Sequence, residues 1–501
     1  MSFKVELIAM APEIFLISII QYLIIYGVIC TTSSHLNYPI LVNNLSWLSL
    51  QVLFFLGLMT SYNPLTYTLA FNDLLILDEF SSFIKTIIIV ATACTILISL
   101  KYNHFERINA FESIILLLLA VTGILLLISS FNLVSIYLAI ELQSFCLYIL
   151  AALNRTSEFS TEAGLKYFVL GAFSSGLLLF GLSLIYGFTG ILNLGDLFQF
   201  LSVSPYNVYV INGINLASLF ILVGLLFKLS AVPFHLWAPD IYEGAPTTTT
   251  AFFASVPKIG ILALLTRFAY LGFYDIFFSW QELFVISAIC SILLGTFGAL
   301  MQLKLKRLLA YSAIGHMGFM LIGFSCGCFE GIHATFVYIV LYMMMAIVSF
   351  TFLLGIYQKK KLTRLHYLKD LTILTNSNPL IALSIAFVFF SMAGIPPLAG
   401  FFSKMFLFIV AIQSSMYTIA IIVVLTSVIS CFYYIRVIKL VFFDTSYLWV
   451  PLVRLDREKS IMVSVITTFL VCFAIYPLPI IYSVQNVLYF IVRNQFDLFY
   501  T

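Results

Sequence analysis

Ionisable side chains lie inside long apolar stretches of this sequence. Glu141 lies in SIYLAIELQSFCLYIL, Lys228 in LFILVGLLFKLSAVPFHLW, Lys258 in TTTTAFFASVPKIGILALLTRF and Lys404 in FVFFSMAGIPPLAGFFSKMFLFIV. A charged residue at the centre of a membrane helix costs roughly 2.5 to 3.5 kcal/mol on insertion scales. Groups retained at that cost are typical of ion or proton pathways, and structural ion pairs or hydrogen-bonded polar residues facing a helix bundle are the alternative.

Proton exchange is the chemistry that this set of residues supports. Pairing Glu141 with one lysine still leaves two buried ammonium groups. Burial favours the neutral form of a lysine and a nearby carboxylate favours the charged form, so a lysine subject to both can take up and release a proton. His316, in RLLAYSAIGHMGFMLIG, adds an imidazole suited to a relay, although a lone histidine is more often a satisfied core residue.

Prolines interrupt two of these apolar stretches. Pro233 follows Lys228 by five residues, and Pro396 and Pro397 precede Lys404. Proline removes an intrahelical hydrogen bond, so both segments are expected to break at membrane depth. Irregular backbone there is tolerated inside protein or beside a hydrated cavity, and discontinuous helices mark ion sites in transporters. A dry packing kink is the alternative.

Membrane-spanning helices must position these residues. Of the 501 residues 62% are hydrophobic and 9% charged, with a mean hydropathy of +1.11, whereas a soluble domain carries about a quarter charged residues. The apolar runs are continuous and do not alternate, which favours helices over a barrel. About fourteen stretches of spanning length are expected, centred near residues 18, 53, 90, 120, 142, 175, 225, 260, 291, 316, 343, 397, 428 and 471.

The predicted fold is therefore an all-α polytopic membrane protein of about 14 transmembrane helices. The two interruptions occupy the fourth helix of each of two five-helix blocks, and an odd number of helices per block makes the blocks opposite in orientation, as in an inverted repeat. The expected organisation is an N-terminal three-helix segment over 1–110, five-helix repeats over 111–272 and 281–445, and a C-terminal helix and tail over 446–501.

Lysine and arginine segregate to alternate loops, which predicts the orientation. With the N-terminus outside, the outer loops between helices hold almost none, as expected of the side opposite the cytoplasm or matrix. The inner loops hold Lys101, Arg107, Arg155, Lys166, Lys304, Lys306, Arg307, Lys359, Lys360, Lys361, Arg364, Lys369, Arg436, Lys439, Arg454, Arg457 and Lys459. Lys85 and Arg267 fall near predicted helix ends, where long side chains can reach the headgroups.

Other classes of site lack support in the sequence. The eight cysteines are scattered, and Cys326 and Cys328 have no adjacent metal-ligating pattern, so neither a zinc site nor a disulfide framework is indicated. No basic run interleaved with aromatics suggests nucleic acid. The sequence contains no flavin or dinucleotide fingerprint and no iron–sulfur cysteine spacing, which predicts that this chain holds no redox cofactor.

The segment PFHLWAPDIYEGAPT, from Pro233 to Thr247, resembles a known protein family. With AIELQSFCLYILAAL, KRLLAYSAIGHMG and AGIPPLAGFFSK, this stretch resembles the antiporter-like membrane subunits of respiratory complex I, NADH:ubiquinone oxidoreductase, and YEGAPT points to the chain 2 members. The resemblance implies proton translocation through a buried row. In that row, Glu141 would modulate the charge of Lys228. The two half-channels would be bridged by Lys258 and His316, and Lys404 would be the terminal exchanger.

The resemblance also implies surroundings. Electron transfer, with FMN, iron–sulfur clusters and ubiquinone, would occur in other subunits, and the partners would be other complex I membrane subunits and lipid, including cardiolipin. The mitochondrial inner membrane is the expected location, with a bacterial plasma membrane as the alternative. A redox-independent cation/proton antiporter subunit and a membrane scaffold without transport are the competing functions. The roles of His235, Asp240 and Glu243 stay open.

Overall fold

The computed structural model describes residues 3–31, 38–63, 67–105, 110–203, 208–355, 366–444 and 455–500, and these are almost entirely helical. The chain forms two compact units. The first comprises Met1–Leu229, Gly244–Trp280 and Gln485–Thr501, and the second comprises Ser230–Glu243 and Gln281–Val484. The division into repeats expected from the sequence stays a prediction, and its boundary at 445 lies outside the described residues.

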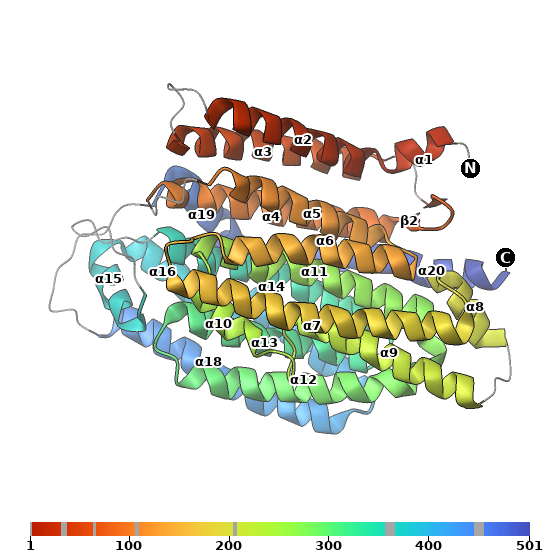
Figure 1. The fold of residues 1–501 in the computed structure, drawn as a ribbon. Coiled ribbons are helices and arrows are strands. Elements are labelled where there is room, and N and C mark those ends of the chain that lie inside the picture. The colour runs from red at the N-terminus through yellow and green to blue at the C-terminus, as the bar shows by residue number, and fades with distance from the viewer. Residues whose placement is uncertain are drawn as a thin grey trace. The chain divides into compact units, whose positions relative to one another are not determined.

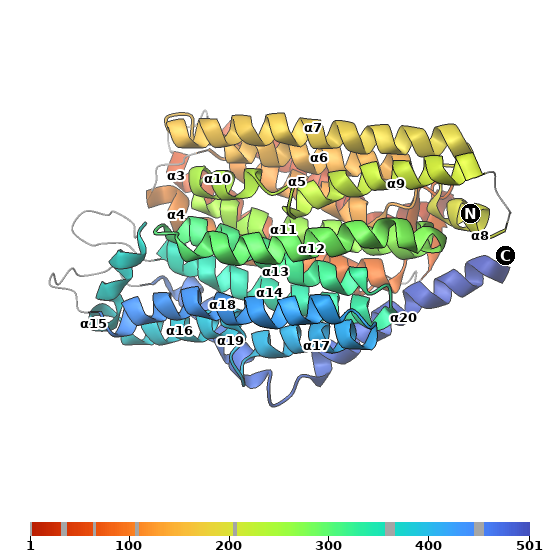
Figure 2. The same cartoon turned by 90° about the horizontal axis from the view of Figure 1, so that it is seen from below.

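The first unit is built around long helices that pack along one another. It contains α1 (Phe3–Ala9), α2 (Ala11–Thr31), α3 (Tyr38–Ser61), α4 (Glu79–Phe105), α5 (Glu112–Ser129), α6 (Leu133–Ala151), α7 (Glu158–Thr189), α8 (Leu194–Val203), α9 (Val208–Leu229) and α11 (Thr247–Thr266). A short hairpin of β1 (Thr68–Ala70) and β2 (Leu75–Leu77) precedes α4, and a π-helical segment, Arg267–Gly272, follows α11. Within this unit α5 lies beside α6 (Figure 1), and α7 lies along α9 (Figure 2).

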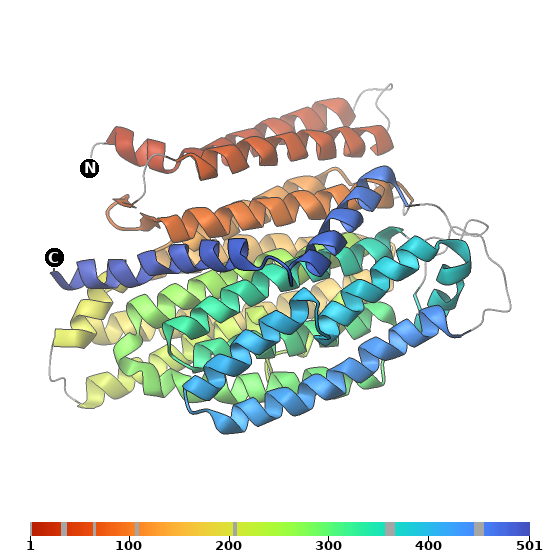
Figure 3. The ribbon, with the colours of Figure 1, turned by 180° about the vertical axis from the view of Figure 1, so that it is seen from behind.

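The second unit carries the other set of spans. It contains α10 (Trp237–Gly244, up to Glu243), most of α12 (Phe277–Leu300), α13 (Leu305–Ser325), α14 (Phe329–Gly355), α15 (Leu374–Ser377), α16 (Pro379–Ala393), α17 (Ala399–Gln413), α18 (Tyr417–Phe442) and α19 (Arg457–Cys472). The 3-10 segment Leu368–Ile373 precedes α15. Helices α16 and α18 pack side by side, as the view from behind shows (Figure 3). The last helix, α20 (Leu478–Tyr500), begins in this unit.

The helical pattern confirms the predicted fold class. Twelve helices among the described residues are long and apolar enough to cross a membrane, and the shorter apolar helices α16 and α17 together fill the stretch centred near residue 397. The stretch near 471 falls in α19. Part of the expected C-terminal tail is helical as α20. Of the inner-loop cations, Arg107, Lys359, Lys360, Lys361, Arg364 and Arg454 lie outside the described residues.

Both predicted interruptions are present. Helix α9 ends at Leu229 and α10 begins at Trp237, and α16 ends at Ala393 while α17 begins at Ala399. In each case the residue after the helix has left-handed backbone, with φ of 62° at Ser230 and 86° at Gly394. A left-handed residue stops the helical hydrogen-bond ladder, and the prolines downstream prevent its continuation.

Close approach of backbones shapes the second interruption. A Cβ atom at Gly400 would lie 1.7 Å from the carbonyl oxygen of Ser391, so only glycine fits between α16 and α17. The Gly400 amide also donates to Ser391 Oγ at 3.1 Å. The two half-helices are therefore joined across the break by a buried hydrogen bond, which fixes the start of α17.

The expectation that Lys85 and Arg267 reach the headgroups is wrong. Both side chains are buried in the first unit, and each has a carboxylate partner. Lys85 Nζ lies 2.5 Å from Glu13 Oε1, and Arg267 Nη2 lies 2.6 Å from Asp78 Oδ1. Glu13, on α2, and Asp78, just before α4, are far from their cations in the sequence, so a linear reading cannot reveal the pairs, in which a carboxylate takes the place of water.

Replacing Gly400 by alanine should destabilise the protein. The added Cβ would displace the Ser391 carbonyl, and overpacking of this kind costs about 1–3 kcal/mol. Gly176→Ala in α7 is the matched control, because a Cβ there meets nothing within 4 Å. The midpoint of thermal unfolding of the solubilised protein should fall for Gly400→Ala and stay level or rise for Gly176→Ala; equal midpoints would contradict the close contact.

The Glu13–Lys85 pair should show the asymmetry of a buried ion pair. Lys85→Met leaves a buried carboxylate without its cation, which costs about 3–5 kcal/mol, whereas replacing both partners by apolar residues is nearly neutral. The double variant Glu13→Leu/Lys85→Met is therefore expected to recover most of the unfolding midpoint lost by Lys85→Met. A double variant no more stable than the single one would show that Lys85 does not act through Glu13.

Candidate functional site

Lys404 reaches back across the second interruption. Its Nζ donates to the carbonyl oxygens of Met392 and Ala393, at 3.1 and 2.8 Å, and only 8% of the residue is exposed. These are the last carbonyls of α16, which lack partners within the helix and carry the negative end of its dipole. The interruption thus supplies the ligands that allow a cation to be buried at this depth.

Gly394 makes room for this arrangement. A Cβ on Gly394 would lie 3.0 Å from Lys404 Cδ, and the residue's positive φ disfavours any side chain. The ring of Phe319, on α13, lies 5.3 Å from the ammonium. The lysine is therefore held by carbonyls on one side and by an aromatic face on another.

His316 lies between two tyrosines in the same unit. Its Nδ1 is 2.8 Å from the hydroxyl of Tyr338 on α14, and its Nε2 is 3.1 Å from the hydroxyl of Tyr434 on α18. Phe319, one turn after His316, stacks on Tyr338 with ring centroids 6.3 Å apart. The ring of Phe319 therefore contacts both Tyr338, which is a partner of His316, and the ammonium of Lys404.

Lys228 is held differently in the first unit. It lies in the last turn of α9, and its Nζ is 3.2 Å from the hydroxyl of Tyr148 on α6. Glu141, two turns before Tyr148 on the same helix, makes no direct ion pair with Lys228 among the described residues. Its Oε1 is buried without a hydrogen-bond partner there, while Ser144 Oγ lies 3.5 Å from Oε2. The influence of Glu141 on the charge of Lys228 stays a prediction.

Lys258 lies in the most enclosed helix of the first unit. Every residue of helix α11 except Thr248 is buried, and Lys258 is 1% exposed. The helix packs against α4, α5, α6 and α9, so Lys258 belongs to the same unit as Glu141 and Lys228. A continuous row joining these three residues to His316 and Lys404 stays a prediction.

The two lysines lie on opposite sides of their interruptions. Lys228 precedes its break and lies in the last turn of the first half-helix, whereas Lys404 follows its break by a full turn and folds back. Lys228 itself belongs to the last turn of the half-helix before its break, and the Lys404 ammonium contacts the last carbonyls of the half-helix before its break. Cations are stabilised at that end by the helix dipole.

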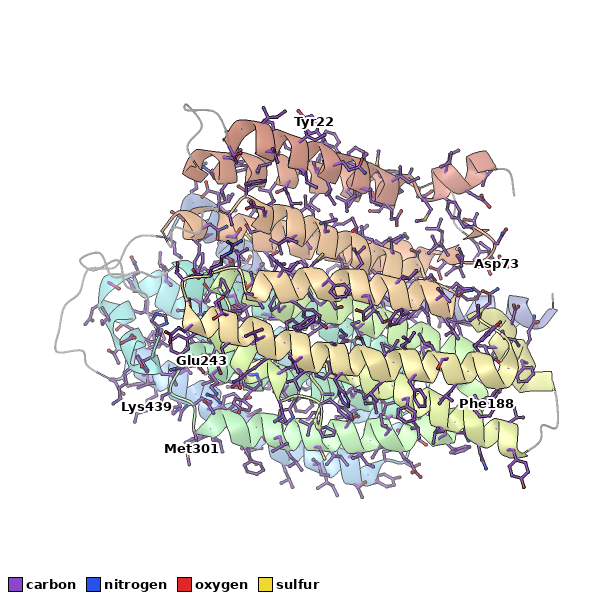
Figure 4. All side chains as sticks on the ribbon, in the orientation of Figure 1. Tyr22, Asp73, Phe188, Glu243, Met301 and Lys439 are labelled. Atoms are coloured by element: carbon purple, nitrogen blue, oxygen red, sulfur yellow. The ribbon has the colours of Figure 1, made fainter. Side chains whose placement is uncertain are left out.

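Asp240 and Glu243 pair with cations in the second unit. Lys304 Nζ bonds Glu243, and Arg307 lies 3.3 Å from Glu243 Oε2 and 3.7 Å from Asp240 Oδ1. Figure 4 shows Glu243 and Lys439 at the same end of this unit, where the sequence places inner-loop cations. These carboxylates link α10 to the start of α13. His235 is half-buried, and its Nδ1 has no hydrogen-bond partner in the described part of the chain.

Sequence reasoning missed three tyrosines that contact the ionisable groups: Tyr148, Tyr338 and Tyr434. One signal was available, because Tyr148 follows Glu141 by seven residues and therefore shares its helix face. Tyr338 and Tyr434 lie on other helices than His316, so no local spacing could reveal them.

Comparison with known proteins agrees with these features. Residues 130–430 match the family model described as NADH:quinone oxidoreductase/Mrp antiporter, TM. The NADH-ubiquinone oxidoreductase chain 2 of Marchantia polymorpha is 48% identical over 482 residues, which cover 95% of this chain and 97% of that one. The chain belongs to the NADH:quinone oxidoreductase/Mrp antiporter family.

Bacterial members and solved structures extend the likeness. NADH-quinone oxidoreductase subunit N of Parvibaculum lavamentivorans is 40% identical, covering 86% of this chain and 87% of that one. A chain of respiratory complex I from Thermus thermophilus, solved with bound aureothin, is 27% identical with a TM-score of 0.75, covering 92% of this chain and 98% of that one. The family match includes both interruptions and all five ionisable residues.

Gly394→Ala should disturb Lys404 specifically. The added Cβ would press on Lys404 Cδ and strain the left-handed turn, which costs about 1–2 kcal/mol. The unfolding midpoint should fall, and a density map of the variant should show the ammonium displaced from the Met392 and Ala393 carbonyls. Gly187→Ala, where a Cβ meets nothing within 4 Å, is the control. An undisplaced Lys404 would contradict the role given to Gly394.

Proposed function

We propose that this chain is the proton-translocating, antiporter-like membrane subunit of a respiratory NADH:quinone oxidoreductase. The observation that carries the proposal is the placement of Lys404, whose buried ammonium rests on the open carbonyls of an interrupted helix. Such a site can hold a charged lysine, and loss of its proton leaves a neutral amine that needs no buried counter-ion. Family membership supports the same function.

The proposed path uses residues in both units. Glu141 sets the electrostatic environment of Lys228. Protons then pass between the half-channels through Lys258 and His316, and Lys404 exchanges them with the far side. Tyr338 and Tyr434 give His316 hydrogen-bond partners on both ring nitrogens. Each partner can accept or donate, so a proton arriving at one nitrogen can leave from the other.

Electron transfer and ion movement are proposed to occur in different subunits. NADH oxidation, FMN, iron–sulfur clusters and quinone reduction belong to other subunits, and this chain contributes the ion movement. Its partners are neighbouring membrane subunits of the complex, and the surrounding lipid, including cardiolipin, covers its apolar faces. The close plant relative supports the inner mitochondrial membrane as the location, and the subunit N relatives make the bacterial plasma membrane the alternative.

A redox-independent cation/proton antiporter is the second candidate, because the matching family includes Mrp antiporters. The curated relative at 48% identity favours the redox-linked assembly. Purification separates the two: co-purification with NADH:quinone reductase activity supports the first, and a chain that exchanges cations for protons in complexes without that activity supports the second.

Removing either Lys228 or Lys404 should impair proton movement. In complexes reconstituted into vesicles, Lys228→Met and Lys404→Ala are expected to lower NADH-driven proton uptake strongly, on the order of 100-fold where this step limits turnover, since each removes a group that carries the proton. Lys166→Ala is the control, because Lys166 is an exposed lysine paired with Glu162 on the surface of α7. Normal uptake with Lys228→Met would reduce the chain to a scaffold.

A further inference from the structure

A cavity of about 1110 Å³ opens in the first unit beside Tyr148. It lies where α5 begins, α6 ends and α7 begins, and its polar lining includes Glu112, Asn154, Arg155 and Thr161. Glu112 and Arg155 are exposed, whereas Tyr148 is 6% exposed, so the tyrosine is the buried end of this opening. A cavity of this size with several polar groups can hold many water molecules.

Tyr148 also contacts Lys228 from this position. Its hydroxyl lies 3.2 Å from Lys228 Nζ, and the ammonium lies 5.6 Å from the centre of its ring. The hydroxyl is the hydrogen-bond partner that the structure shows for this lysine, whose side chain is only partly buried. One side chain therefore borders both the cavity and the first lysine of the proposed path.

The neighbouring residues hold the Tyr148 hydroxyl in this place. A Cβ on Gly171, in α7, would lie 2.1 Å from Tyr148 Oη, so a glycine reserves the space that the hydroxyl occupies. The rings of Tyr167 and Phe168 meet the Tyr148 ring edge-on, with centroids 4.7 and 5.8 Å away. The position of the Tyr148 hydroxyl is therefore fixed by the space that Gly171 leaves and by the two neighbouring aromatic rings.

We infer that Tyr148 is a proton-relay residue that joins water in this cavity to Lys228. The inference rests on the proposed function, because it identifies where protons enter the path. The cavity lies at the helix ends near Arg155 and Lys166, the side that the loop charges assign to the cytoplasm or matrix. Tyr148 thus loads Lys228 from the inner phase.

The relay step conserves atoms and charge. When Lys228 is neutral, the Tyr148 hydroxyl turns to donate, its O–H bond breaks and a new N–H bond forms on the amine. A hydronium ion in the cavity gives a proton to the phenolic oxygen in the same event and becomes water, so tyrosine is regenerated and one proton has moved from the cavity to Lys228. The Glu141 carboxylate lies two turns before Tyr148 on the same helix, where opposite charge attracts the cation that results.

The test compares Tyr148→Phe with Tyr167→Phe in the assembled complex, reconstituted into vesicles. Both remove one hydroxyl from the same aromatic cluster, and only the first removes the partner of Lys228. We expect Tyr148→Phe to lower NADH-driven proton uptake about tenfold or more, the scale of a lost proton-transfer group, and to change its solvent deuterium isotope effect. Tyr167→Phe should keep the wild-type value of both.

Further variants separate the inference from the proposed function. Normal uptake by Tyr148→Phe together with impaired uptake by Lys228→Met would overturn the relay and leave the proposed function intact. Normal uptake by Lys228→Met would overturn both. Gly171→Ala, which displaces the hydroxyl and keeps the tyrosine, should reproduce the loss seen with Tyr148→Phe.

A labelling experiment covers the case in which a Tyr148 variant fails to assemble. Thr161→Cys places a thiol in the cavity lining without touching Tyr148 or Lys228. A membrane-impermeant thiol reagent added from the inner side should modify it and slow proton uptake, whereas Ser183→Cys, on the exposed part of α7 away from the cavity, should be insensitive. A thiol at residue 161 that is unreactive from the inner side would overturn the relay.

Discussion

A buried charge needs polar ligands to replace water, and the interrupted helices supply them. An intact helix uses its carbonyls internally, so it offers nothing to a neighbouring ammonium. A helix that stops within the membrane leaves its last carbonyls open, and two of these hold Lys404. The break between α16 and α17, the glycines at positions 394 and 400 and the buried Lys404 therefore depend on one another.

The two interrupted segments carry their lysines at different positions in the sequence. Measured along the chain, Lys228 and Lys404 occupy different places relative to their breaks, which makes the repeat appear imperfect. Within each unit, Lys228 belongs to the last turn of a half-helix, and the Lys404 ammonium contacts the last carbonyls of one. Both lysines are thus associated with the carboxyl end of a half-helix, Lys228 by its place in the chain and Lys404 by its folded-back side chain.

Buried charges serve two purposes in this protein. Arg267 and Lys85 each contact a carboxylate directly, and such pairs hold helices together because separating them leaves an uncompensated charge. Lys228 and Lys404 contact a hydroxyl and carbonyls, which tolerate either protonation state of the lysine. Under the proposed function, the type of partner therefore separates the cations that stabilise the fold from those that carry protons.

The sequence alone determined the helical membrane fold, the two interruptions and the five ionisable positions, because hydrophobic runs, prolines and charges in apolar segments are local features. The tertiary structure alone decided the partners. It showed that Lys85 and Arg267 are paired instead of reaching the headgroups, that Tyr148 stands between Lys228 and a cavity, and that Lys404 folds back onto α16. Such contacts join residues on different helices or across a break, and their distances depend on packing that no local pattern encodes.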